Sequence, residues 1–119
     1  MYIRWIRFSL GAGQRAVLQA LADEIVPVLA AQPGCRHVSL CGDAADGNGG
    51  LIALWDTAPQ AKAAAKQVRP RLEALLAGHA LGPLETNLFE VFAHHSVREE
   101  ERTVSGALLD SRTFFKSAS

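Results

Sequence analysis

The chain has 119 residues, of which 49% are hydrophobic and 20% are charged, a composition typical of one globular domain and not of a disordered segment. Twelve basic and twelve acidic residues give a formal net charge of zero, so we expect no basic surface for phosphates and no nucleic-acid partner. A net charge near zero also weakens repulsion between copies and favours self-association.

Three features lead us to expect a cytoplasmic protein with no membrane partner. The longest uncharged runs are shorter than the roughly 20 residues of a membrane span. The opening segment MYIRWIRFSL carries arginines inside its apolar run, unlike a signal peptide. On one extended strand, Cys35 and Cys41 would lie about 20 Å apart. A disulfide needs Cα atoms within about 7 Å, so we expect reduced thiols.

The first two predicted elements are a strand and a helix. Over residues 2–10, aromatic and branched side chains alternate with Arg4 and Arg7, which indicates a strand. After the glycine-rich break at residues 11–13, apolar residues recur at helical spacing over residues 14–31. Pro27 lies inside this predicted helix and should kink its axis.

A β-hairpin is predicted next. Residues 35–41 and 51–55 read as strands, and GDAADGNGG between them is dense in residues that favour turns. The second of these strands is apolar throughout. On the first strand, alternation would place four side chains on one face: Cys35, His37, Ser39 and Cys41.

A second helix and a last strand complete the pattern. Thr57 and Gln60 have the spacing of a capping box, so the helix should begin beside them. We expect Pro70 to end or kink this helix, and a further short helical turn to close at Gly78. Residues 86–95 then read as the fourth strand.

The predicted order β-α-β-β-α-β is that of a ferredoxin-like α+β fold, a four-stranded antiparallel sheet with both helices on one face. Apolar residues on both faces of the predicted sheet indicate that the second face is covered too, most simply by another copy of the chain. We expect this domain to span residues 1–95. Residues 96–119 form a C-terminal extension that either docks on the partner or frays.

Five features resemble the antibiotic biosynthesis monooxygenase superfamily: the opening strand, PGC before the second strand, the strand ending in Trp55, the helix directly after it, and Gly82-Pro83 before the last strand. The resemblance covers residues 1–95. It implies a homodimeric α+β barrel with sheets packed face to face, and a pocket between the sheet and helices of each subunit. Members of the family oxidise aromatic polyketides or quinols without metal or flavin, and others cleave haem.

The resemblance disfavours haem as a cofactor here. Trp55 matches a tryptophan that many members carry at the end of the third strand, including the haem degraders. Those also use an asparagine on the first strand and a histidine on the helix after the tryptophan. The first strand here has no asparagine, residues 58–69 have no histidine, and His79 lies beyond Pro70. We therefore expect no cofactor.

Two residues are the leading site candidates, each with an alternative interpretation. Trp55 could line the pocket and contact the substrate, or it could fill the core. His79 could accept a proton from a phenol or quinol, since an ordinary imidazole titrates near pH 6.5, or it could simply be solvated.

The other candidate substrate-binding residues lie on the predicted strands. Arg4 and Arg7 point to opposite faces of the first strand, where either could bind a carboxylate or phenolate, or could be a charge at the dimer interface or at the rim. Trp5 shares a face with Arg7, and His37 is the remaining candidate. His37 could share a metal with its cysteine neighbours. No further ligand cluster accompanies them, so we expect no metal site.

Three functions remain open from the sequence. The first is a cofactor-independent monooxygenase acting on a small aromatic or quinol-like substrate beside Trp55. The second is a non-enzymatic dimeric ligand-binding or interaction module of the same fold. The third is a divergent haem-binding or haem-degrading protein. A cavity of a few hundred Å³ beside Trp55 would favour an enzyme or a ligand carrier, and a filled interior would favour a structural role.

Overall fold

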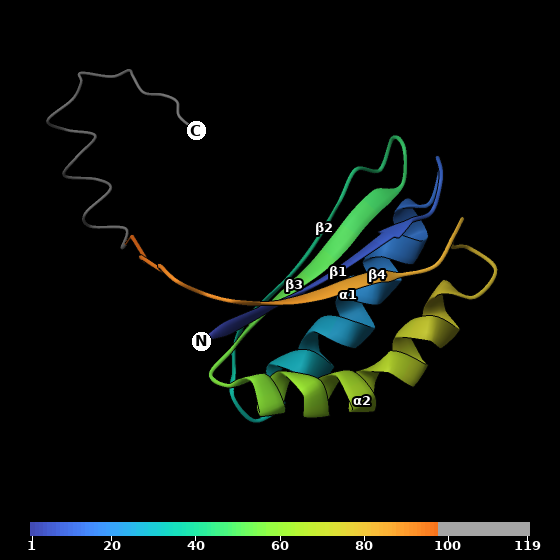
Figure 1. Ribbon diagram of the computed structural model, residues 1–119. Helices are drawn as coiled ribbons and strands as arrows, with labels where there is room; N and C mark the ends of the chain where they lie inside the picture. Colours follow the sequence, from blue (N-terminus) through green and yellow to red (C-terminus); the bar gives the residue numbers. More distant parts are fainter. Residues whose placement is uncertain (98–119) are drawn as a thin grey trace, which may run out of the picture.

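Residues 1–97 are the part of the chain that the computed structural model describes. They form six elements: β1 (Tyr2–Ser9), α1 (Arg15–Ala30), β2 (Cys35–Gly42), β3 (Asn48–Trp55), α2 (Ala58–Leu76) and β4 (Glu85–Glu90). The strands form one antiparallel sheet in the order β2-β3-β1-β4, and both helices cover the same face of it (Figure 1). The predicted ferredoxin-like fold is confirmed. The predicted C-terminal extension lies outside the described residues from residue 98 onward.

The core lies between the helices and one face of the sheet. β3 is a central strand with a partner on each side, and alternate residues of its apolar run belong to the core. Alternate residues of β1 and β3 face the helices and meet their apolar stripes. The buried core comprises Phe8, Leu10, Leu21, Ile25, Leu29, Leu51, Ala53, Trp55, Ala61, Ala64, Val68, Leu72 and Leu76.

Helix α2 begins where the sequence predicts and runs without a break past Pro70. The Thr57 side chain caps it: its hydroxyl oxygen accepts a hydrogen bond from the Gln60 N–H at 3.3 Å. Of the two alternatives predicted for Pro70, an end or a kink, the end is wrong, because α2 continues through Pro70 to Leu76. Val68 and Leu72 are buried on either side of Pro70, while the proline ring is exposed. Burial of the apolar stripe therefore outweighs the hydrogen bond that proline removes.

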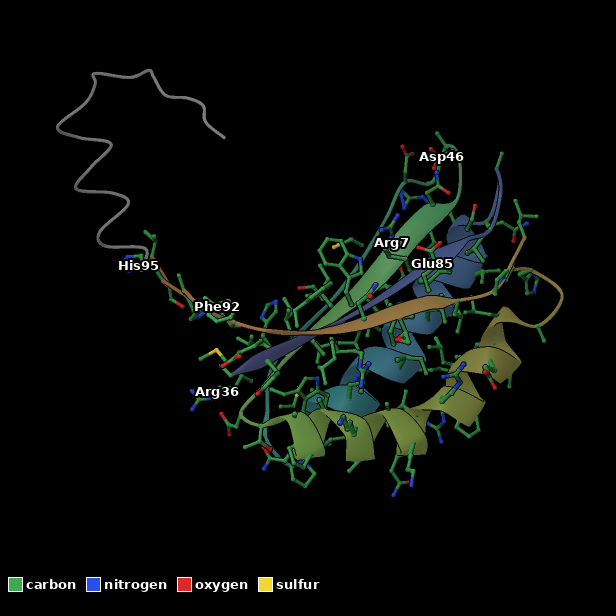
Figure 2. The ribbon with its side chains drawn as sticks, in the orientation of Figure 1. Arg7, Arg36, Asp46, Glu85, Phe92 and His95 are labelled. Carbon is green, nitrogen blue, oxygen red and sulfur yellow. The ribbon has the colours of Figure 1, made fainter. Side chains whose placement is uncertain are left out.

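The end of β4 and the face of Cys35 also differ from prediction. β4 pairs only with β1, whose N-terminus lies opposite Glu90, so the predicted strand loses its partner there and does not reach His95. The chain then runs away from the sheet and helices, and Phe92 is 91% exposed (Figures 1 and 2). In β2 a bulge between Cys35 and His37 shifts the register, so Cys35 packs against the core and does not share a face with His37.

The connection into β3 approaches β1 closely. β3 begins at Asn48, three residues before the predicted start, because Asn48 pairs with Ser9 of β1. Just before it, Gly47 has a φ of +76° and its carbonyl accepts the Leu10 N–H at 2.9 Å. A Cβ on Gly47 would lie 2.0 Å from the Gly11 carbonyl oxygen, so only glycine fits here.

None of the helices within residues 1–97 is long and apolar enough to cross a membrane.

Candidate functional site

A cavity of about 140 Å³ lies between the helices and the helix-facing side of the sheet. An apolar cavity of about 150 Å³ can hold one benzene ring, so this space suits a single ring and is far too small for a tetrapyrrole. Its lining is mostly aliphatic and comes from five elements and from the loop before β4. The lining residues are Arg4, Ile6, Ile25, Leu29, Leu51, Ala53, Ala61, Ala65, Val68, Arg69, Leu72, Leu84 and Thr86.

Small side chains create this space. Ala53 of β3 and Ala61 and Ala65 of α2 line the cavity with single methyl groups. The two helical alanines belong to the alanine-rich first half of α2. Where a leucine would fill the gap between helix and sheet, these positions leave it open. The alanine run was the signal in the sequence that could have revealed the cavity.

Arg4 brings the one charge into the interior of this cavity. In β1 it pairs with Ala53 on one side and Leu88 on the other, and the alternation of the strand turns it toward the helices. Its Nε is buried and has no hydrogen-bond partner within residues 1–97. Burial lowers the pKa of the Arg4 guanidinium, although arginine remains charged at neutral pH. A cation therefore forms part of the cavity wall, and its buried Nε lacks an acceptor within residues 1–97.

The cavity opens between α2 and β4. Its innermost residues, such as Ile25 and Leu51, are fully buried, whereas Arg69 and Thr86 are exposed. Arg69 is held on the helix surface by Glu73, with 2.9 Å between its Nε and the Glu73 Oε2. A ligand that enters here meets polar groups first, then aliphatic walls, and then Arg4.

Three other candidates lie on the opposite, open face of the sheet. Trp5 is 40% exposed there. Arg7 faces Glu85 across the β1–β4 pair, with 3.8 Å between its Nε and the carboxylate (Figure 2). The ring Nε2 of His37 lies 2.7 Å from the Ser39 hydroxyl. None of these three residues lines the cavity.

Trp55 and His79 are also outside the cavity lining. Trp55 is 1% exposed and belongs to the core, and its Nε1 has no hydrogen-bond partner within residues 1–97. Ala53, two residues earlier on the same face of β3, lines the cavity instead. His79 is exposed in the loop after α2, where its backbone N–H donates to Leu76.

The thiols and histidines of residues 1–97 do not gather into a group of three or more that could hold a metal. Cys35 and Cys41 are free thiols on opposite sides of the sheet. Burial raises the pKa of the Cys35 thiol, which keeps it protonated and unreactive at neutral pH.

Solved structures share this fold, whereas neither a protein-family model nor a curated protein matches the chain. Rv0793 from Mycobacterium tuberculosis superposes with a TM-score of 0.67 at 19% identity, over 80% of this chain and 98% of that one. SnoaB, a cofactor-independent oxygenase from Streptomyces nogalater, gives 0.62 at 20% identity, over 78% and 95%. The monooxygenase ActVA-Orf6 of Streptomyces coelicolor, in complex with nanaomycin D, gives 0.65 at 13% identity, over 82% and 92%.

Another matching structure bears the name antibiotic biosynthesis monooxygenase. The chain therefore has the fold of antibiotic biosynthesis monooxygenases, as the resemblance in its sequence implied. At these identities the likeness concerns the fold.

Proposed function

We propose that the protein is a cofactor-independent monooxygenase of the antibiotic biosynthesis monooxygenase family, and that its substrate is a one-ring phenol or quinol bound in the cavity against Arg4. One observation carries this proposal: an apolar cavity of about 140 Å³ is lined by Arg4, whose buried Nε has no acceptor within residues 1–97. An ionised phenol oxygen pairs with the positive charge of this guanidinium, and its ring fills the aliphatic space.

The proposed chemistry depends on the positive charge of Arg4 and on the exclusion of water from the cavity. Arg4 stabilises the phenolate, because a charge-assisted hydrogen bond is strongest where water is excluded. The phenolate is a better electron donor to O₂ than the neutral phenol. For methylhydroquinone the balanced reaction is C₇H₈O₂ + O₂ → C₇H₆O₃ + H₂O. One oxygen atom replaces a ring hydrogen, the other leaves as water, and the quinol supplies the remaining two electrons as it becomes a quinone.

The protein orients the ring and ionises it. Confinement between Ala53 and α2 fixes the ring, and proximity of this kind lowers the barrier without any cofactor. No carboxylate, imidazole or thiol lines the cavity, so the phenol proton must travel from the site beside Arg4 to bulk water through the opening. A His79→Gln variant should therefore keep its activity. A loss of activity in that variant would instead assign proton acceptance to His79.

We also propose that the protein is a homodimer formed through the open face of the sheet. Trp5 is 40% exposed and Phe89 is 49% exposed. Trp5 pairs with Asn87, and Phe89 pairs with Ile3. Along β1 and β4 these residues alternate with the residues that face the helices, so both aromatic side chains lie on the open face. Large exposed side chains on one sheet face are typical of an association surface. Covering this face leaves the opening between α2 and β4 free.

A non-enzymatic ligand carrier is the second candidate, favoured by one observation. The cavity lining contains two arginines and a threonine but no carboxylate, imidazole or thiol. A site built in this way binds an anion without a base of its own beside the ligand. Oxygen consumption separates the two functions, because a carrier binds the quinol and leaves its oxidation rate unchanged.

The test is oxygen uptake with methylhydroquinone, corrected for autoxidation in buffer. We expect the wild type to accelerate uptake and Arg4→Met to fall to the buffer rate. Arg71→Met is the matched control, because Arg71 is exposed on α2 and does not line the cavity; it should retain the wild-type rate. Equal rates for the wild type and Arg4→Met would contradict the assignment.

A further inference from the structure

We propose that the natural ligand also carries a carboxylate, which Arg69 binds at the opening, so that the ligand belongs to the hydroxybenzoate class. This inference rests on the proposed function in placing the phenol oxygen at Arg4. The two guanidinium groups lie at different depths of one cavity, Arg4 inside and Arg69 at the exposed rim. A ring with one acidic group at each end meets both.

The position and orientation of the Arg69 guanidinium suit it to bind a carboxylate. Its side chain is 59% exposed and lines the cavity. The Nε–Glu73 hydrogen bond fixes the plane of the guanidinium. This hydrogen bond uses Nε, and the two terminal nitrogens present donors in the fork geometry that matches a carboxylate.

Thr86 supplies a further polar group from the other side of the opening. It lines the cavity from β4, and its hydroxyl can donate to a carboxylate oxygen. The neighbouring Glu85 pairs with Arg7 on the open face, so its charge points away. Glu73 is then the one acidic side chain paired with Arg69, and it leaves the terminal nitrogens available.

The cost of removing water from each acidic group of the ligand decides which one enters the interior of the cavity. A carboxylate is fully ionised at neutral pH, so its transfer into an apolar interior is costly. A phenol enters neutral and ionises only beside Arg4. The carboxylate therefore stays at the rim, where Arg69 and water both reach it.

The experiment measures equilibrium binding under anaerobic conditions, so that turnover plays no part. The probes are 4-hydroxybenzoate and 4-hydroxybenzamide, which have nearly the same shape but differ in charge. An ion pair at an exposed rim is weakened by water, so the wild type should bind the acid a few-fold more tightly than the amide. Arg69→Met should reduce this ratio to about one, whereas Arg71→Met should keep it. Thermal unfolding checks that both variants fold, and Arg69→Gln provides a second variant.

Equal affinity for the acid and the amide in the wild type would overturn the inference, as would a preference that survives Arg69→Met. Failure of both compounds to bind, while methylhydroquinone is still oxygenated, would overturn this inference and leave the proposed function standing. Loss of both the binding and the oxygenation would overturn the two together.

Discussion

Arg4 and Ala53 are register partners across the β1–β3 ladder, and both line the cavity. A long cationic side chain therefore lies directly beside a methyl group, on the face of the sheet that the helices cover. Any larger side chain at position 53 would occupy the space beside the guanidinium. The pair explains both the volume of the cavity and its charge.

Replacing Arg4 by Met should abolish phenol binding without weakening the fold. Folding lowers the pKa of this base, so the folded state disfavours its charged form at every pH below the ordinary arginine value. Removal of the charge therefore relieves a cost that is present across the neutral range. We expect an unchanged or raised melting temperature together with loss of ligand-induced stabilisation. A melting temperature lowered by many degrees would show that Arg4 is structural.

Filling the cavity should weaken ligand binding while leaving the protein folded. Ala65→Leu places three extra carbons in the cavity, whereas Ala63→Leu, on the exposed side of the same helix, places them in solvent. We expect Ala65→Leu to lower ligand affinity at least tenfold and to change stability by up to about 2 kcal/mol in either direction. Ala63→Leu should change neither quantity appreciably. Calorimetric titration and thermal unfolding measure both, and similar affinities for the two variants would contradict the cavity site.

Trp55 should prove to be a core residue. Trp55→Ala removes a side chain that is 1% exposed, and such a change costs about 3–5 kcal/mol. Trp55→Phe should cost less, because it keeps most of the packing and removes an N–H with no partner within residues 1–97. Denaturant unfolding measures both costs. If Trp55→Phe folds normally but loses the ligand, Trp55 contacts the substrate directly.

The open sheet face should control the oligomeric state. Trp5→Glu places a charge at the centre of this face and should shift a dimer toward monomer in sedimentation experiments, because a charge buried in an interface is costly. Leu81→Glu is the control, since Leu81 is also an exposed apolar residue but lies in the loop before β4. A dimer that persists in Trp5→Glu would place the interface elsewhere.

Two glycines offer a test of the close approach between β1 and the β2–β3 connection. Gly47 and Gly13 have almost equal positive φ angles, +76° and +77°. A Cβ on Gly13 meets nothing within 4 Å, whereas one on Gly47 collides with the Gly11 backbone. Gly13→Ala should cost about 1–2 kcal/mol from backbone strain alone, and Gly47→Ala should cost clearly more. Equal costs would show that this contact is not tight in solution.

Local sequence signals predict most of the fold. The alternation in residues 2–10, the helical spacing of α1 and the Thr57 cap depend on neighbours along the chain, and the structure confirms them. The wrong predictions concern features that depend on residues far away in the sequence. α2 continues through Pro70 because the sheet and α1 bury its stripe, and β4 ends at Glu90 because β1 offers no further partner. The bulge at Cys35 is likewise a property of the β2–β3 pair.

The candidate site shows the same difference between what local sequence predicts and what distant residues determine. Strand alternation alone places Arg4 and Arg7 on opposite faces, but it does not say which face the helices cover. The cavity itself depends on what neighbouring side chains fail to fill, so no local pattern picks out Arg69 or Thr86. Trp55 is the largest side chain of β3, but the cavity lies beside Ala53, two positions earlier on the same face.

The most direct test of the central claim is the oxidation of methylhydroquinone under ¹⁸O₂, followed by mass spectrometry of the hydroxylated quinone. Autoxidation followed by addition of water puts solvent oxygen into that product, so the label distinguishes the two routes. We predict one ¹⁸O atom per product molecule with the wild type, and no label above the buffer control with Arg4→Met. Unlabelled product from the wild type would contradict oxygenation in the Arg4 cavity.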